Sequence, residues 1–110
     1  MSARSSSPPP LAVRRALRDV SGHVQTWRKL RGLTQNQLAD RAGIDRKSLI
    51  RLEQGDAGVS FGLVLRVLHA LGVLDELSSS VDPYASDLGR LRADEQLPRR
   101  VRPREVKDDG

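Results

Sequence analysis

Four side chains between residues 46 and 51 have the types and spacing to recognise the edges of base pairs. They are Arg46, Lys47, Ile50 and Arg51. At helical spacing these four share one face, because Leu49 and Leu52 face the opposite way. An arginine fork fits O6 and N7 of guanine, and an exposed isoleucine could pack on the methyl group of thymine. The same pattern would also suit a solvated charged face with Ile50 shielded by arginine stems. The choice between these two interpretations depends on the helices that surround the four residues.

A second group of polar residues is suited to phosphate. Thr34 and Gln35 stand at the start of a predicted helix, where unpaired amides and the positive end of the helix dipole attract anions. Ser48 and Gln54 lie beside the base-reading residues on the next predicted helix. We expect Thr34, Gln35, Ser48 and Gln54 to contact phosphates, which positions a protein on a duplex without reading its sequence.

Glycines and capping residues mark the helices that would carry these side chains. Gly32, Gly43, Gly55 and Gly72 each follow an apolar periodic run, as expected for a C-terminal helix cap whose residue takes the left-handed backbone conformation. Thr34, Asp45 and Ser60 can each cap a helix start, and Thr34 with Gln37 forms a capping box. The sequence therefore predicts helices over residues 20–31, 35–42, 46–54 and 61–71.

The apolar residues of these helices predict one small core. Val20, Val24 and Trp27 would face inward from the first helix, and Leu38, Leu49, Val67 and other aliphatic residues from the next three. Val73, Leu74 and Leu77 would begin a short fifth helix that closes the core. The short connection between residues 43 and 45 makes the second and third helices cross sharply, which is a helix-turn-helix.

The segment from Gly32 to Gly55 resembles the helix-turn-helix of the phage-repressor (Cro and cI) family. The resemblance rests on the Thr-Gln-x-x-Leu-Ala start, the Ala-Gly-Ile turn and the Leu-Glu-x-Gly end. It implies an all-α fold, a compact five-helix domain whose third helix enters the major groove of double-stranded DNA, usually from a two-fold homodimer. It also implies an ion pair between Arg28 and Glu53 that ties the first helix to the third.

Several function classes lack the residues they need. The chain has no cysteine, and His23 and His69 are isolated, so we expect no metal site, no cofactor and no enzyme activity. Both histidines are predicted to lie at the surface. The longest apolar stretch, residues 61–77, contains charged residues, so no membrane segment is expected. A cytoplasmic protein, associated with the nucleoid when bound to DNA, fits this composition.

The domain organisation is predicted from composition and charge. Residues 1–18 would form a disordered or partly helical leader, 19–79 the helix-turn-helix domain, and 80–110 a C-terminal tail. Ser78 to Ser80 is interpreted as a linker. Asp82-Pro83 would start a short helix over 83–97, despite Gly89. On it, Tyr84, Leu88 and Leu91 form a stripe that could bind a partner.

Two functions follow from these expectations. The first is a transcriptional repressor that binds an inverted-repeat operator as a homodimer. The second is the antitoxin of a toxin-antitoxin pair, because the chain resembles HipB-like antitoxins in its small size and single repressor-type domain; it would repress its own operon and neutralise a HipA-like kinase toxin. In addition, the basic run from Arg99 to Arg104 could grip flanking nucleic acid without sequence preference.

Overall fold

The regular structure of the protein is helical throughout the residues that can be described. The structure is a computed structural model, and it describes residues 7–97. Its elements are α1 (Leu11–Leu30), α2 (Gln35–Ala42), α3 (Arg46–Glu53), α4 (Phe61–Leu71), α5 (Leu74–Ser80), the 3-10 helix η1 (Pro83–Ala85) and α6 (Asp87–Gln96). The expected all-α fold is confirmed. The chain divides into two compact units, residues 1–74 and 75–110, which are described separately.

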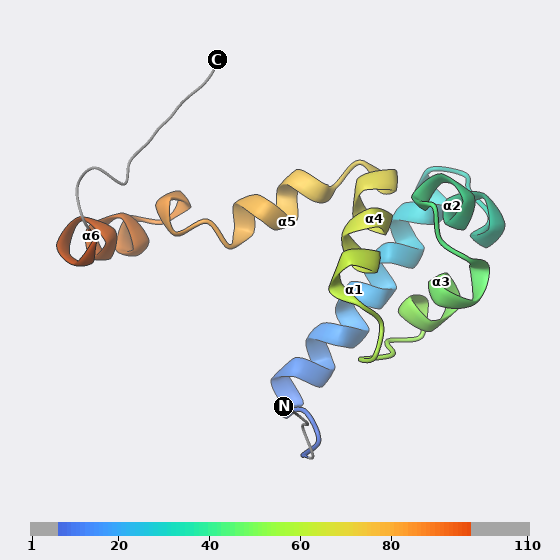
Figure 1. Ribbon diagram of the computed structural model, residues 1–110, viewed down its shortest axis with the longest axis horizontal. Coiled ribbons are helices and arrows are strands. Elements are labelled where there is room, and N and C mark those ends of the chain that lie inside the picture. Colours follow the sequence, from blue (N-terminus) through green and yellow to red (C-terminus); the bar gives the residue numbers. More distant parts are fainter. Residues whose placement is uncertain (1–6, 98–110) are drawn as a thin grey trace. The chain divides into compact units, whose positions relative to one another are not determined.

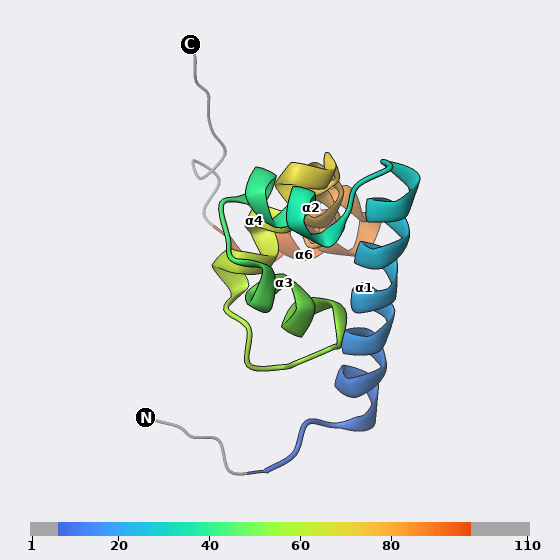
Figure 2. The same cartoon turned by 90° about the vertical axis from the view of Figure 1, so that its right-hand side faces the viewer.

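The first unit is a bundle of α1 to α4 around one apolar core (Figures 1 and 2). α2 and α3 contact each other, α4 contacts α1 and α2, and α1 also contacts α3. The buried apolar residues of the core are Val24, Leu33, Leu38, Ala39, Ala42, Leu49, Leu52, Val67 and Leu71. Ile44, Val59 and Val64 pack against this core from partly buried positions. Leu33, Ile44 and Val59 directly precede the capping residues of α2, α3 and α4, and they therefore hold the first turns of these helices to the core.

The predicted helix ends are confirmed at the level of hydrogen bonds. Thr34 Oγ1 accepts from the amide of Gln37 at 3.1 Å, while the amide of Thr34 donates to Gln37 Oε1 at 2.9 Å, which completes the capping box. Asp45 and Ser60 cap α3 and α4 in the same manner. All four marked glycines have the positive φ of the left-handed region, between 69° and 82°.

The predicted start of the first helix, at residue 20, is wrong. α1 begins at Leu11, directly after the three prolines, and Pro10 takes the position of the N-cap without a side-chain hydrogen bond. Residues 11–19 contain leucine, alanine and arginine, which are strong helix formers. Most of these residues are exposed, so the segment lacks the buried stripe by which periodicity identifies a helix. The part of the predicted leader that precedes Ser7 and the predicted role of the basic run from Arg99 to Arg104 lie outside the described residues.

Two aromatic and aliphatic residues of α1 were wrongly assigned to the core. Trp27 is 38% exposed and Val20 is 42% exposed. The face that packs is carried by Ser21, Val24 and Arg28, and Trp27 lies about 100° of helical rotation from Arg28. The indole is covered instead by the guanidinium of Arg31, which lies 5.5 Å from the ring centroid. Trp27 is thus a surface residue in a cation–π pair.

The second unit consists of short helices with little buried surface. α5 contains all three serines, so their interpretation as a linker is wrong, whereas the predicted fifth helix does form. η1 begins where Asp82 Oδ1 accepts from the amide of Tyr84, and Ser86 then caps α6. Among the described residues of this unit only Ala93 is buried. None of the described helices is long and apolar enough to cross a membrane.

Gly89 is the point at which η1 and α6 meet. A Cβ atom at this position would overlap the carbonyl oxygen of Pro83. Arg90 Nη1 donates to the carbonyl oxygen of Tyr84 at 2.7 Å, and Arg90 also pairs with Asp87. The glycine that weakened the predicted helix is therefore required for the close contact between these two elements.

Candidate nucleic-acid interface

The turn between α2 and α3 fixes the direction in which α3 leaves the core. Gly43 ends α2 with φ 71°, and the amide of Ile44 donates to the carbonyl oxygen of Ala39 at 3.0 Å. Asp45 Oδ1 then accepts from the amide of Ser48 at 2.8 Å and starts α3. Because each residue of this turn is hydrogen-bonded or buried against the core, α3 is held at one angle to α2.

The outer face of α3 carries the residues predicted to read bases. Arg46, Lys47 and Arg51 are exposed, while Ile50 is half-buried. Ile50 is thus less exposed than its three charged neighbours, because the fold already covers part of this side chain. Leu49 and Leu52 are buried on the opposite side of the helix, as expected. The face therefore presents three cations around one partly covered aliphatic group.

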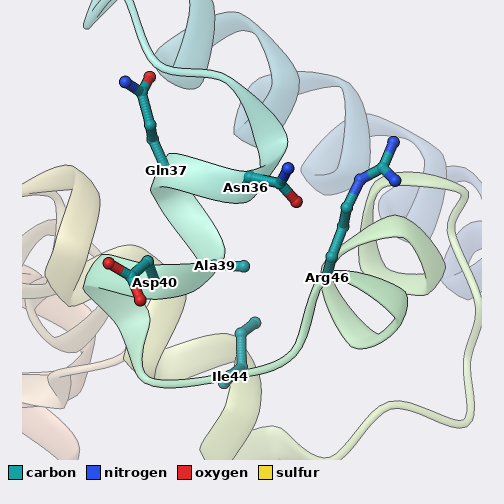
Figure 3. Close-up of a pocket in the computed structure, with 6 residues that line it drawn as sticks. All are labelled: Asn36, Gln37, Ala39, Asp40, Ile44 and Arg46. Carbon is teal, nitrogen blue, oxygen red and sulfur yellow. The ribbon is translucent and has the colours of Figure 1, made fainter.

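Arg46 lies beside the first turn of α2. Two surface hollows adjoin it, and both are lined by Arg46 and Asn36. Figure 3 shows Asn36 extending from α2 toward the side on which Arg46 lies, whereas Gln37 and Asp40 project from other sides of α2. The second hollow is lined in addition by Thr34 and Gln35. The structure thus brings the first residue of α3 next to two of the residues predicted to contact phosphate.

The N-terminus of α2 retains backbone donors at this hollow. In a capping box the side-chain acceptor satisfies the third helical amide and leaves those of the first two helical residues without a partner in the helix. In α2 these two are Gln35 and Asn36. They point along the helix axis at its positive end, where an anion is favoured. Asn36 was missed by sequence reasoning, which assigned the phosphate contact to its neighbours.

Glu53 is the centre of a hydrogen-bond network that joins three helices. Its Oε2 accepts from Arg28 Nε at 2.8 Å, and its Oε1 accepts from Arg28 Nη2 at 3.1 Å and from Gln35 Nε2 at 3.0 Å. The side chains of Arg28 and Glu53 are 13% and 4% exposed. Gln35, predicted to bind phosphate, therefore uses one of its two amide protons inside the protein, and only the other can face an anion.

Two further residues of α1 hold the end of α3 and were not predicted. Ser21 Oγ, which is buried, lies 2.7 Å from the carbonyl oxygen of Leu17 and 2.8 Å from that of Leu52. Gln25 Nε2 donates to the carbonyl oxygen of Glu53 at 2.7 Å. Together with Arg28, these residues recur at i, i+4 and i+7 on one helical face. That spacing is visible in the sequence, but an inner helical face is normally identified by apolar residues, so three polar residues on it were not recognised.

Arg51, one of the predicted base readers, is bound to a residue of the following loop. Its Nε donates to Asp56 Oδ2 at 2.7 Å, and Asp56 Oδ1 accepts from the amide of Gly58 at 2.7 Å. The hydrogen bond from Arg51 lowers the pKa of Asp56 below its ordinary value, and the same bond raises the pKa of Arg51. Sequence reasoning did not single out Asp56.

The remaining predicted site residues lie near α3 with different surroundings. Ser48 is half-buried, and hydrogen bonds from it lower the pKa of the capping residue Asp45. Gln54 is exposed and ends α3. Within the described residues there is no group of three or more side chains able to hold a metal ion. The arrangement is that of a polar, mainly cationic surface.

Comparison with known proteins identifies the family to which the chain belongs. The helix-turn-helix family profile matches residues 24–75. Over 49 residues the chain is 43% identical to an uncharacterized HTH-type transcriptional regulator of Methanothermobacter thermautotrophicus. The matched segment covers 44% of this chain and 71% of that protein. No solved structure gives a significant match. The protein belongs to the helix-turn-helix family of DNA-binding transcriptional regulators.

Proposed function

We propose that this protein is a transcriptional repressor that places α3 in the major groove of an inverted-repeat operator. The observation that carries the proposal is the position of Arg46 beside the N-terminus of α2. A phosphate held by the amides of Gln35 and Asn36 would set the height of α3 in the groove. Arg46 and Lys47 would then reach base edges, and Arg51 would follow one turn later.

The roles of the four reading residues and the phosphate contacts differ in this proposal. Arg46, Lys47, Ile50 and Arg51 face the bases, with Arg46 best placed for guanine and Ile50 for the exposed part of a thymine methyl group. Thr34, Gln35, Ser48 and Gln54 would contact the phosphates of the duplex backbone on either side of these residues. Two copies related by a two-fold axis would read half-sites about one duplex turn apart.

The proposal is tested by selecting bound sequences from a random DNA pool with the full-length protein. We expect an inverted repeat. On that operator, Arg46→Ala should flatten the preference among single base-pair variants, because its contact is specific to one position. Gln35→Pro should weaken binding to every variant to a similar degree, since proline fits the first position of a helix and removes an amide donor, together with the Gln35 side-chain amide, without touching the base-reading face. Equal losses for both variants across the panel would contradict the assignment.

The second candidate function is the antitoxin, in which the second unit binds a protein partner such as a HipA-like kinase. The observation that favours it is the exposure of apolar side chains on η1 and α6: Tyr84 is 48%, Leu88 62% and Leu91 56% exposed. Contiguous exposed apolar groups commonly mark a protein-binding surface. The proposal assigns DNA binding to the first unit and partner binding to Tyr84, Leu88 and Leu91.

A genetic and a biochemical measurement separate the two candidates. An antitoxin should have a kinase-like gene in the same transcription unit, and the purified kinase should bind the full-length protein. Leu88→Ser with Leu91→Ser should abolish that binding and leave operator affinity unchanged. If the neighbouring gene encodes no kinase and the variant behaves as the wild type in every assay, the antitoxin function is excluded and the repressor function stands alone.

A further inference from the structure

The loop after α3 holds one arginine of the reading face in a fixed orientation. Arg51 and Asp56 are 50% and 39% exposed at the side chain, so their ion pair lies at the surface beside the proposed DNA-binding face. Asp56 is itself anchored, because its second carboxylate oxygen accepts from the amide of Gly58. The pair is therefore oriented at both ends: by α3 at Arg51 and by the loop backbone at Asp56.

This contact decides which donors of Arg51 remain for a ligand. A guanidinium has five N–H groups, one on Nε and two on each terminal nitrogen. Asp56 occupies Nε, and the two terminal nitrogens remain. These two nitrogens form the end of the fork and match the paired acceptors O6 and N7 of guanine. A free arginine, in contrast, can swing to the nearest phosphate and use any pair of its donors.

Gly58 supplies the space that the pair occupies. A Cβ atom at this position would lie 3.1 Å from Asp56 Oδ1 and 3.2 Å from Arg51 Nη2. Both distances are tighter than ordinary contacts of a Cβ atom, so a larger residue would displace the carboxylate, the guanidinium or both. Gly58 thus leaves room for the pair of Arg51 and Asp56, and a Cβ atom in its place would require one of these side chains to move by a few tenths of an ångström.

We propose that Asp56 is a specificity-determining positioning residue, which holds Arg51 so that the end of its fork reads one guanine and does not bind phosphate. The inference rests on the proposed function, because it concerns how the same face selects its operator. Asp56 itself touches no base in this proposal. A carboxylate near DNA weakens nonspecific attraction, and this cost is consistent with a role in discrimination.

A loop tie without influence on recognition is the competing explanation for the Asp56 contacts. Under that explanation, removing the carboxylate would lower stability and weaken binding to all sequences alike. Under the positioning proposal, the loss is confined to one base pair, and binding to unrelated DNA stays equal or becomes stronger because Arg51 is released to phosphates. The two explanations are therefore separated by where the loss falls, not by its size.

The experiment uses the full-length protein and the operator selected from the random pool. Equilibrium dissociation constants are measured for that operator, for every single base-pair substitution in one half-site, and for an unrelated duplex. The proteins compared are the wild type, Arg51→Ala, Asp56→Asn, the double variant of these two, Gly58→Ala and Asp19→Asn. Asp19 is exposed on α1, outside the helix-turn-helix, so its variant controls for the lost negative charge. Urea unfolding of each protein controls for stability.

We expect Arg51→Ala to remove discrimination at one base pair and Asp56→Asn to reduce it at the same base pair by about tenfold. Gly58→Ala should reduce it there as well, while Asp19→Asn should leave the whole pattern unchanged. Adding Asp56→Asn to Arg51→Ala should cause no further loss, because the aspartate acts through the arginine.

Several outcomes would overturn the proposal. These are an unchanged pattern in Asp56→Asn, an equal loss at all positions, or an Arg51→Ala variant that alters no position. In each of these cases the wild type still selects an operator, so the proposed repressor function stands, and only the last outcome also removes Arg51 from the base-reading residues. If the wild type selects no sequence at all, the proposed function fails and this inference fails with it.

Discussion

The carboxylate of Glu53 accepts hydrogen bonds from side chains of two other helices, and its negative charge strengthens both contacts. The carboxylate accepts hydrogen bonds from Arg28 of α1 and Gln35 of α2, while its own backbone carbonyl accepts from Gln25. A buried ion pair contributes little to stability relative to a well-packed apolar pair, but loss of one partner leaves an uncompensated charge. The stability of the protein is therefore sensitive to substitution of Glu53, although this residue is not part of the base-reading face.

Glu53→Gln should destabilise the protein by about 3 kcal/mol, because the guanidinium of Arg28 keeps its charge in a site that is mostly closed to water. Urea unfolding at neutral pH measures this change. The double variant Arg28→Gln with Glu53→Gln removes both charges and should recover part of the loss. A double variant less stable than Glu53→Gln alone would contradict this account of the pair.

The elements of the first unit are bounded by local hydrogen bonds that the sequence predicted well. Thr34, Asp45 and Ser60 cap their helices because short polar side chains fit the first turn, and this depends only on neighbours a few residues away. The length of α1 was predicted poorly, since residues 11–19 form a helix by propensity without a buried stripe. Local capping is thus more predictable than the extent of an exposed helix.

The cap of α3 makes a pH-dependent contribution to stability. The hydrogen bonds from Ser48 lower the pKa of Asp45 below the ordinary aspartate value of about 3.9. A depressed pKa in the folded state means that the contribution is complete above the ordinary value and is lost as the pH falls through the folded value. Asp45→Asn, which caps nearly as well without a charge, should match the wild type at pH 7.

Thermal unfolding between pH 2 and pH 6 measures this difference. Over the acidic part of that range, the unfolding midpoint of the wild type should fall more steeply than that of Asp45→Asn. The same comparison with Asp19→Asn, which changes a carboxylate outside the cap, serves as the control. Parallel curves for the wild type and Asp45→Asn would show that the cap does not titrate with folding.

The contact between η1 and α6 predicts an effect of glycine substitution opposite to helix propensity. Gly89→Ala should favour α6 as an isolated helix, yet the new methyl group would overlap the carbonyl oxygen of Pro83. We expect η1 to detach, so that the amide signals of Tyr84 to Ser86 shift in NMR spectra while those of α2 and α3 do not. Gly62→Ala in α4, where a Cβ atom meets nothing within 4 Å, is the matched control. Unchanged signals in Gly89→Ala would contradict this packing.

At the scale of the whole molecule, charge separates the two units. Arginine and lysine dominate the segment before α2, whereas aspartate and glutamate outnumber them after Leu74. Attraction to DNA is therefore expected from the first unit, and its strength should fall with salt as counterions are released. Binding of a partner through the exposed apolar side chains of the second unit should not weaken with salt in this way.

Lys47→Gln should reduce the slope of log K against log salt by about one for each bound copy of the protein, because an ammonium in the groove, although assigned to base edges, also displaces counterions from the neighbouring phosphates. A dimer on an inverted repeat therefore loses about two, and a monomer about one. Binding titrations between 50 and 300 mM salt measure the slope, with Asp94→Asn in α6 as a control expected to leave it unchanged. A slope equal to that of the wild type would remove Lys47 from the proposed interface.

The candidate site was predictable where it depends on motif and helical period, and less so where it depends on packing. Arg46, Lys47 and Arg51 lie exposed on one face because α3 has a buried opposite side. Asn36 and Asp56 were missed, because their roles arise from the approach of two segments and not from their own spacing. Trp27 was wrongly placed in the core, since a single residue, about 100° of helical rotation, separates the inner face from the surface.

The network around Glu53 also has a kinetic consequence. It joins α1, α2 and α3 through contacts within the chain itself, so the arrangement of these helices does not depend on a contact with DNA. Proteins that order a segment on binding lose part of their interaction free energy to that step, and they bind with a large change in heat capacity. A preassembled face should instead associate with a rate set by diffusion and electrostatic steering, and release DNA as one rigid body.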